Sequence, residues 1–187
     1  CCGTSPAHIT AIREAVDGYA PRTPVSNVGR NHMVSGIEPL QYDDSMRPLF
    51  IGERTNVIGS RKFKELIVDG KLEEAAEIAR AQVKNGAHVI DICLANPDRD
   101  EVEDMRNFMP EVVKKVKVPI VIDSTDERVM EEALKFCQGK AIINSINLED
   151  GEERFDAVMP LVKKYGAAVV VGTIDETGMA ITRERKL

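Results

Sequence analysis

Ile120-Val121-Ile122-Asp123-Ser124-Thr125 is the stretch that decides the fold. Three β-branched residues in a row, followed at once by a carboxylate and two hydroxyls, are typical of a short strand buried on both faces. Four further apolar runs also end in or just before a polar side chain. They are Leu49 to Gly52 before Glu53, Val89-Ile90 before Asp91, Ala141 to Ile143 before Asn144, and Ala167 to Val171 before Thr173 and Asp175. The sequence therefore predicts a series of buried strands.

Helical periodicity fills the gaps between these runs. Apolar residues recur every three or four positions in the segments 71–85, 102–116, 127–138 and 152–165. Pro110 lies inside the second segment, and because proline lacks a backbone donor we expect a kink or a new helix start there. Strands that alternate with helices form a parallel sheet. The predicted fold class is α/β, a partial (β/α)8 TIM barrel of about four and a half βα units.

Polar side chains at the carboxyl ends of parallel strands meet at one rim of the sheet, where such enzymes bind their ligands. Asp123 is the first candidate, because Asp126 is available to cap the next helix in its place. Asn144 holds the equivalent position after the fourth run. Glu53 and Asn56 offer hydrogen-bonding groups at the first run, although their loop can also be read as a cap that ties the strand to a helix.

Asp91 ends the second run, and two interpretations of it stay open. Its carboxylate can bind a ligand at the rim, or it can hold the rim loops together through hydrogen bonds. The residue types and their spacing do not decide between the two.

The composition limits the partners of the protein. The 187 residues carry a net charge of −6, with 43% hydrophobic and 30% charged residues, as in an ordinary globular protein. Lys and Arg are scattered among acidic residues, which argues against nucleic acid as a partner. No apolar stretch approaches the roughly 20 residues that span a membrane, and the N-terminus does not resemble a signal peptide. The cysteines suggest no disulfide framework, so we expect a cytoplasmic protein without membrane contact.

The N-terminal part differs from the rest of the chain. Residues 6–16 have helical spacing, whereas residues 20–47 are rich in Pro, Asn and Ser without sustained periodicity, which predicts an extended linker. Cys1 and Cys2 precede the helix. Two adjacent thiolates do not complete a tetrahedral zinc site, so in isolation the pair reads as a chance occurrence. Because the sequence lacks an initiator Met and ends in a charged tail, we expect a fragment of a longer protein.

These residues together resemble the cobalamin-dependent methionine synthase family. Cys1-Cys2-Gly3-Thr4 before a short helix is similar to the end of that family's homocysteine-binding barrel. Gly52 to Asn56, Ile122 to Thr125 and Asn144 to Ile146 are similar to the start of its second barrel, which binds methyltetrahydrofolate. That pterin-binding barrel is shared with dihydropteroate synthases and corrinoid-protein methyltransferases.

The resemblance implies three regions and one reaction. Residues 1–19 would be the tail of the homocysteine-binding domain, 20–47 an interdomain linker, and 48–187 the N-terminal half of the pterin-binding domain. The activity implied is a methyltransferase that moves a methyl group from 5-methyltetrahydrofolate to cobalamin and on to homocysteine. The cobalamin-binding domain would be a partner within the full-length protein, and the fragment alone is expected to be inactive.

The resemblance also assigns the candidate residues. Asp123 and Asn144 would bind the pterin ring at the catalytic centre, and Glu53, Asn56 and Asp91 would complete this side of the rim. The adjacent pair Cys1-Cys2 would bind zinc together with a third cysteine that lies upstream.

Two alternatives stay open. The chain can belong to a pterin-dependent methyltransferase that acts on a corrinoid protein without homocysteine chemistry, or it can be a non-catalytic partial pterin-binding module. One departure from the resemblance lies in the second run, which reads Asp91-Ile92-Cys93 where much of the superfamily has Asp-x-Asn. Asn96 is the nearest amide that can replace the missing one.

Overall fold

The computed structural model describes residues 2–23 and 32–187, and the chain falls into two compact units, residues 1–30 and 31–187. In the first unit, helix α1 spans Pro6–Val16, as its spacing predicted. Pro6 opens the helix, where a missing N–H loses no intrahelical bond. The backbone N–H of Ser5 donates to Nδ1 of His8 at 3.1 Å. None of the residues of α1 is buried.

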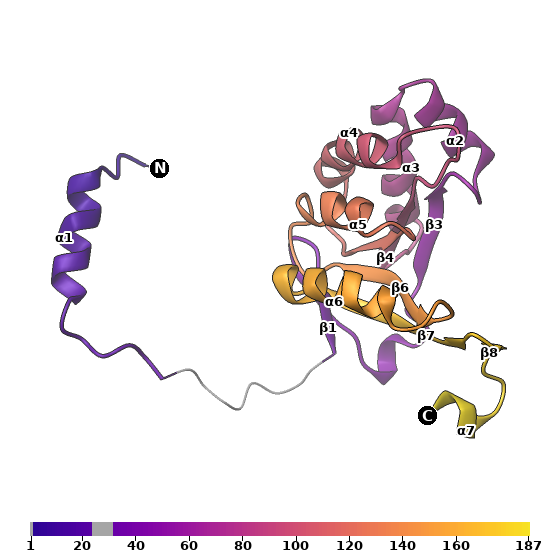
Figure 1. The fold of residues 1–187 in the computed structure, drawn as a ribbon. Coiled ribbons are helices and arrows are strands. Elements are labelled where there is room, and N and C mark those ends of the chain that lie inside the picture. Colours follow the sequence, from indigo (N-terminus) through magenta and orange to yellow (C-terminus); the bar gives the residue numbers. More distant parts are fainter. Residues whose placement is uncertain (1, 24–31) are drawn as a thin grey trace. The chain divides into compact units, whose positions relative to one another are not determined.

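The second unit is built on a curved six-stranded sheet (Figure 1). Its strands are β3 (Ile51–Asn56), β4 (Val89–Cys93), β5 (Ile120–Asp123), β6 (Ile142–Leu148), β7 (Ala168–Asp175) and β8 (Gly178–Met179). They lie in this order, parallel from β3 to β7, and β8 pairs antiparallel with β7. Because neighbours in the sheet are also neighbours along the chain, the sheet is half of a (β/α) barrel. The predicted partial barrel is confirmed.

Helices cover one side of this sheet (Figure 1). They are α2 (Arg61–Val68), α3 (Leu72–Lys84), α4 (Glu101–Lys115), α5 (Glu127–Leu134) and α6 (Glu153–Tyr165), and a short α7 (Arg183–Lys186) follows β8. The last four of the covering helices match the predicted segments to within a few residues. α4 runs continuously through Pro110, so the expected new helix start does not occur. Its buried side chains, Met109 and Val112 among them, hold the helix in place although one backbone donor is missing.

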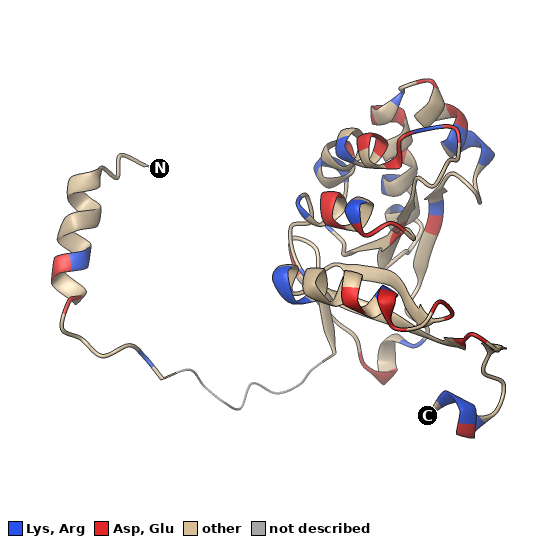
Figure 2. Ribbon diagram, viewed as in Figure 1, with Lys and Arg blue, Asp and Glu red and all other residues tan. Residues whose placement is uncertain are grey.

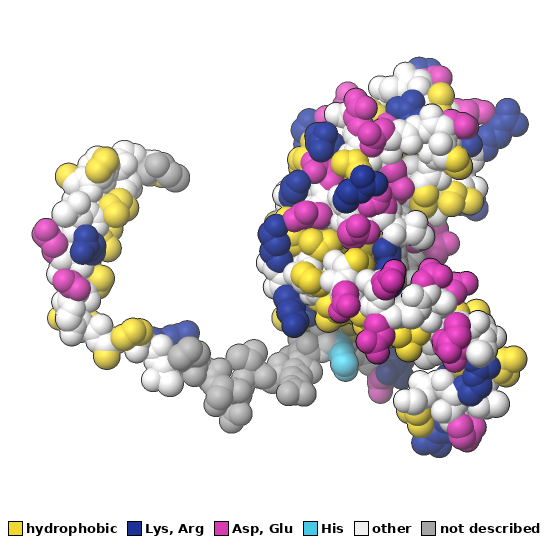
Figure 3. Space-filling view, viewed as in Figure 1, with side chains coloured by type: hydrophobic (Ala, Val, Ile, Leu, Met, Phe, Trp, Pro, Cys, Tyr) yellow, Lys and Arg dark blue, Asp and Glu magenta, His cyan; other side chains and the backbone are white. Residues whose placement is uncertain are grey.

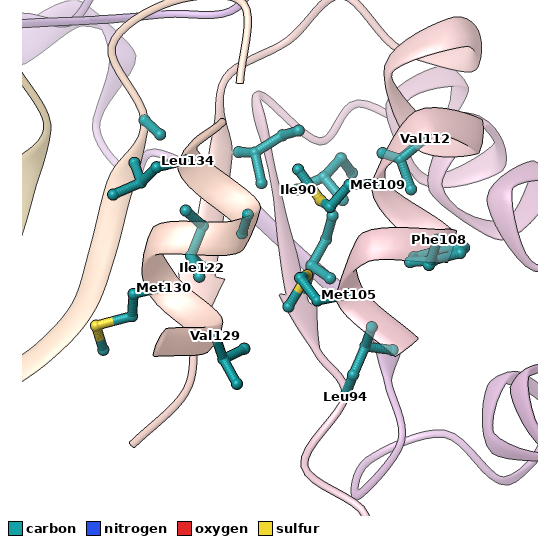
Figure 4. Close-up of a cluster of buried hydrophobic side chains, with 14 of the residues drawn as sticks. Ile90, Leu94, Met105, Phe108, Met109, Val112, Ile122, Val129, Met130 and Leu134 are labelled. Atoms are coloured by element: carbon teal, nitrogen blue, oxygen red, sulfur yellow. The ribbon is translucent and has the colours of Figure 1, made fainter. Parts of the chain in front are cut away.

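The core lies between the sheet and these helices. Ile90 of β4 and Ile122 of β5 lie in the same buried cluster as Phe108 of α4 and Met130 of α5 (Figure 4). Phe63 of α2 meets Phe108 edge to face, with ring centroids 5.3 Å apart. Burying each such side chain contributes about 1.5–3 kcal/mol. The strands are therefore fixed from the helix side, which leaves their inner face free to carry polar groups.

Residues 33–41, within the predicted linker, have regular secondary structure that the sequence pattern did not indicate. These residues form a hairpin of two short antiparallel strands, β1 (Met33–Ser35) and β2 (Pro39–Gln41), and Val34 is buried. The N–H of Ser35 donates to the carbonyl of Lys140 at 3.0 Å, and that of Ile37 to the carbonyl of Lys117 at 2.9 Å. Strands of three residues are too short to produce a periodic pattern. The hairpin packs at the amino ends of β5 and β6, opposite the predicted rim.

Candidate functional site

Side chains alternate along each strand between the helices and the inner face of the sheet. In β4, Ile90 and Ile92 belong to the core under the helices, so Asp91 between them lies on the inner face. Only 4% of the surface of Asp91 is exposed. In β5, Ile122 takes the core side and Asp123 the inner face. The same alternation that builds the core therefore sends carboxylates to the opposite side.

Strand register places four side chains in one row across the inner face, which we call the rim row. Asn56 pairs with Cys93, and Asp123 pairs with Asn144. Ile92 and Ile122 are paired as well, so the residues that follow them, Cys93 and Asp123, lie side by side on neighbouring strands. The rim row thus crosses β3 to β6. It lies at the carboxyl ends of β3, β4 and β5, whereas β6 continues past Asn144 to Leu148. The sequence predicted that Asp123 and Asn144 would meet at this rim.

Asp123 and Asn144 form a hydrogen-bonded pair. The Nδ2 of Asn144 donates to Oδ1 of Asp123 at 3.1 Å. Burial raises the pKa of the Asp123 carboxyl, and the negative charge of Glu53 raises it further. A pocket of about 210 Å³ opens beside the pair, and Ser145 and Arg154 are among its other lining residues. Asp123 keeps unused acceptor capacity, since each carboxylate oxygen has two lone pairs.

Asp91 and Glu53 lie one layer further from the rim than expected. Asp91 is in the middle of β4 and pairs with Val121, two residues before Asp123. Burial raises the pKa of Asp91 to about 7, aided by the negative charges of Asp123 and Glu53, while the Asn56 side chain opposes the shift. Near neutral pH this carboxyl is therefore protonated in a large fraction of molecules.

A β-bulge in β3 positions Glu53. Gly52 pairs with Ile90 and Thr55 with Ile92, so the two residues Glu53 and Arg54 stand opposite the single Asp91. Gln82 of α3 supports the bulge, because its Oε1 accepts from the backbone N–H of Arg54 at 2.7 Å. A Cβ at position 52 would lie 2.8 Å from that same oxygen, which explains the glycine.

Asn56 has a local role in addition to its place in the rim row. Its Oδ1 accepts from the backbone N–H groups of Ile58 at 2.8 Å and Gly59 at 3.0 Å. These bonds close a turn in the loop that leads to α2, whose cap is Ser60. The amide nitrogen is not used by these two bonds.

The loop after β5 is held from two sides. Asp126 caps α5, with its carboxylate accepting from the N–H of Arg128 at 2.8 Å, as the sequence suggested. Arg154 of α6 donates from Nη2 to the carbonyl of Ser124 at 3.0 Å and from Nη1 to the carbonyl of Thr125. Because Asp126 supplies the cap, Asp123 is left available on the inner face.

Three residues near the site were not predicted as parts of it. Cys93 stands in the rim row, and burial raises the pKa of its thiol to about 11, which keeps it neutral. Glu101 begins α4, and its buried Oε1 lacks a hydrogen-bond partner in the described part of the chain. Burial also raises the pKa of Glu101. Neither Glu101 nor Arg154 had a local signal, since charged residues in the first turn of a helix are common. Asn96, the possible amide replacement, is buried beyond the end of β4 and outside the rim row.

A larger open hollow of about 1000 Å³ lies at the amino end of α4. The three arginines that line it already pair with carboxylates. Arg99 binds Asp104 through two contacts of 2.6 Å, and Arg128 contacts Asp126 at 2.6 Å. Because these arginines are engaged in ion pairs, the hollow has little to offer an anionic ligand, and the candidate site is the rim row.

The predicted zinc ligands belong to the other unit. Cys1 lies outside the described residues, and Cys2 is exposed. Within residues 2–23 and 32–187, no group of three or more His, Cys, Asp or Glu side chains is placed to hold a metal ion. The described residues therefore do not form a zinc site by themselves, because such a site takes at least three protein ligands.

The surface carries charges of both signs. Lys and Arg alternate with Asp and Glu along the helices (Figure 2), and the two kinds of side chain intermingle over the face shown in Figure 3. In the described part of the chain, no helix has the length and apolar character needed to cross a bilayer.

A half barrel with a carboxylate–amide pair on the inner face of its strands defines the class: a (β/α)-barrel protein whose candidate site lies near the rim. The particular family follows from a sequence comparison. The family model described as "Pterin binding enzyme" matches residues 52–186, and the chain therefore belongs to the pterin-binding enzymes. The match begins at Gly52 in β3 and includes every residue of the rim row.

Proposed function

We propose that this chain contributes part of the methyltetrahydrofolate site of a cobalamin-dependent methionine synthase. The proposed reaction moves a methyl group from N5 of 5-methyltetrahydrofolate to cobalamin and on to homocysteine. The observation that supports it best is the hydrogen-bonded pair of Asp123 and Asn144 on the inner rim of a pterin-binding family domain. The motifs that precede and surround this pair narrow the proposal to methionine synthase.

The chemistry of the pair suits a pterin. The amino-pyrimidinone edge of the ring presents adjacent N–H donors, which one carboxylate can accept together. Asp123 receives one bond from Asn144 and retains lone pairs on both oxygens for these donors. The amide oxygen of Asn144 can accept a further N–H, and its second amide hydrogen can donate to a ring acceptor. The pair would thus bind both the donors and the acceptors of the ring.

The acidic inner face also suits the reaction. A tertiary amine such as N5 leaves poorly unless it is protonated, and protonation makes the ring cationic. Glu53 and Asp123 lie close enough for the negative charge of one to act on the other. Carboxylates arranged in this way would stabilise a cationic ring more than a neutral one, which favours the state that releases the methyl group.

The remaining parts of the proposed enzyme involve other regions. Cys1 and Cys2 would contribute two thiolates to a zinc site, and at least one further ligand must come from elsewhere in the protein. Zinc would supply a Lewis acid for the homocysteine thiol, and cobalamin would be presented by another domain.

The test uses the protein expressed from its complete reading frame. 5-Methyltetrahydrofolate should bind, and Asp123→Ala should weaken binding roughly ten- to a hundredfold, because a hydrogen bond to a charged group contributes about 1.5–3 kcal/mol. Asp126→Ala is the matched control, since Asp126 caps α5 in the same loop. It should lower stability while leaving folate affinity nearly unchanged. Equal losses in both variants, or no folate binding in the wild type, would refute the proposed site.

Methyl transfer separates the proposal from its nearest alternative. With reduced cobalamin and homocysteine, the wild-type protein should form methionine, and Cys2→Ala should abolish this product while sparing folate binding. A protein that methylates a separate corrinoid protein and ignores homocysteine would belong to the corrinoid-protein methyltransferases instead.

A further inference from the structure

Asp91 is a buried carboxyl with an unsatisfied oxygen. Only 4% of the residue is exposed, and Oδ2 has no hydrogen-bond partner in the described part of the chain. The backbone is well held at this point, because the carbonyl of Asp91 accepts from the hydroxyl of Thr55. The Asn56 side chain interacts with this carboxyl but leaves Oδ2 unpaired. Burying an ionised carboxylate with one oxygen unpaired is destabilising, which favours either the loss of its charge or contact with a ligand.

The groups around Asp91 decide which of these happens. Glu53 faces it from β3 and Asp123 from β5, and both charges are negative. On β4 itself, the neighbour on the same face is Cys93, whose thiol is neutral near pH 7. From α4, Glu101 adds a negative charge that acts on Asp123 and Cys93. The Asn56 amide is the neutral polar group that acts on Asp91. The two charges that act on Asp91, those of Asp123 and Glu53, therefore both favour its protonated form.

We propose that Asp91 works as a neutral carboxylic acid whose O–H donates a hydrogen bond to an acceptor atom of the bound pterin ring. This inference rests on the proposed function, because the acceptor belongs to the folate. The two inner-face aspartates then have opposite tasks. Asp123 accepts from the ring N–H groups as a carboxylate, and Asp91, one layer further from the rim, donates.

The sign of the pH dependence follows from these tasks. The pKa of Asp91 is raised to about 7, so the donor form is complete below that pH and is lost above it. The apparent affinity for folate should therefore fall roughly tenfold for each pH unit above 7, since only the protonated fraction binds. On the acid side, affinity should fall again as the Asp123 carboxylate becomes protonated.

Asp91→Asn and Asp91→Ala, made in the protein expressed from its complete reading frame, test this donor. Asparagine keeps the shape and an N–H donor but cannot titrate, so binding of 5-methyltetrahydrofolate at pH 6 should stay within about threefold of wild type. The fall in affinity above pH 7 should disappear. Alanine removes the donor, and affinity at pH 6 should drop roughly tenfold.

Asp104→Asn is the matched control. Asp104 is as buried as Asp91, with 6% exposed, but both of its oxygens are bound to Arg99. The same substitution there should reduce stability and leave the pH profile of folate binding unchanged. The protonated state of Asp91 can be observed directly, without ligand, as an infrared carbonyl band of a carboxylic acid at pH 6 that is absent from Asp91→Asn.

The outcomes separate the inference from the proposed function. If Asp91→Asn keeps the wild-type fall in affinity above pH 7, or if Asp91→Ala binds as tightly as wild type at pH 6, Asp91 is not the donor, although folate binding stands. Absence of the infrared band also overturns the inference. If the band is present and no folate binds at any pH, the proposed function has failed, and the assigned acceptor fails with it.

Discussion

On its helix-facing side the parallel sheet presents Ile122 and Ile143, both fully buried, whereas its inner face presents Asp91, Asp123 and Asn144. Both sets come from the same strands and alternate along them. The apolar set packs under α4, α5 and α6 and supplies the burial that stabilises the strands. The polar set is held in register by those strands without contributing comparable apolar burial. Stability and binding chemistry are therefore divided between the two faces.

The division has an electrostatic cost. Burial raises the pKa values of both Asp91 and Asp123, which means that the folded state disfavours their ionised forms. The inner face thus loses stability near neutral pH that an apolar face would keep. A surface that tolerates such a cost is characteristic of a site for a ligand.

The largest effect on stability should come from truncating a side chain on the apolar, helix-facing side of the sheet. Ile122→Ala leaves a cavity in the core and should lower the free energy of unfolding by about 2–5 kcal/mol. Ile51→Ala is the matched change on β3, where Ile51 is 45% exposed, and it should cost much less. Chemical denaturation of both variants makes the comparison. Similar losses would mean that the two faces contribute equally to stability.

The next effect concerns the pH dependence of stability. The pKa of Asp91 rises from 3.8 to about 7 on folding, so protonation stabilises the folded state. Its contribution is complete below pH 3.8 and is lost as the pH rises to about 7, a total of about 4 kcal/mol at most. The free energy of unfolding of Asp91→Asn, measured from pH 4 to 8, should fall less steeply than that of wild type. Parallel curves would show that Asp91 ionises normally.

The strands and helices that could be predicted are those long enough to show a recognisable pattern of apolar residues. The crossover helices α3 to α6 carry several apolar residues each at helical spacing, and β4 to β6 are short β-branched runs. The strands of the β1–β2 hairpin have three residues each, too few for such a pattern. Such elements are fixed by tertiary contacts, as the bonds of the hairpin to Lys117 and Lys140 show.

The candidate site could be predicted in part. The position of Asp123 and Asn144 directly after apolar runs was enough to bring them together, although β6 continues past Asn144 to Leu148. The depth of Asp91 and Glu53 could not be predicted, because it depends on the register of β3 with β4 and on the bulge that Gln82 supports. Interstrand register is set by packing and has no local sequence signal.

A smaller effect should follow from changing the amide of the rim row. Asn144→Ala removes the N–H that Asp123 accepts, together with the proposed contact to the ring. Folate affinity should fall roughly tenfold, the cost of one hydrogen bond to a charged group at the lower end of its range. The acid limb of the binding profile should also move to higher pH, because a donor to a carboxylate favours its ionised form. A titration of folate binding from pH 4 to 8 measures both. If affinity is lost at the same low pH in both proteins, Asn144 does not stabilise the ionised form of Asp123.

The smallest effect should come from the residue that holds the loop between the two faces. Arg154 reaches from α6 to the carbonyls of Ser124 and Thr125, the residues that follow Asp123. Arg154→Ala removes these bonds from a partly exposed side chain, so folate affinity should fall only a few-fold, roughly the worth of one ordinary hydrogen bond. Because Arg154 acts through the position of Asp123, the loss should appear in affinity with little change in the rate of methyl transfer at saturating folate. Arg61→Ala, which removes an exposed pair with Glu65, is the control and should change neither quantity. A large fall in the rate of methyl transfer at saturating folate would instead indicate that Arg154 contacts the folate directly. Its effect would then not arise from the position of the loop after β5.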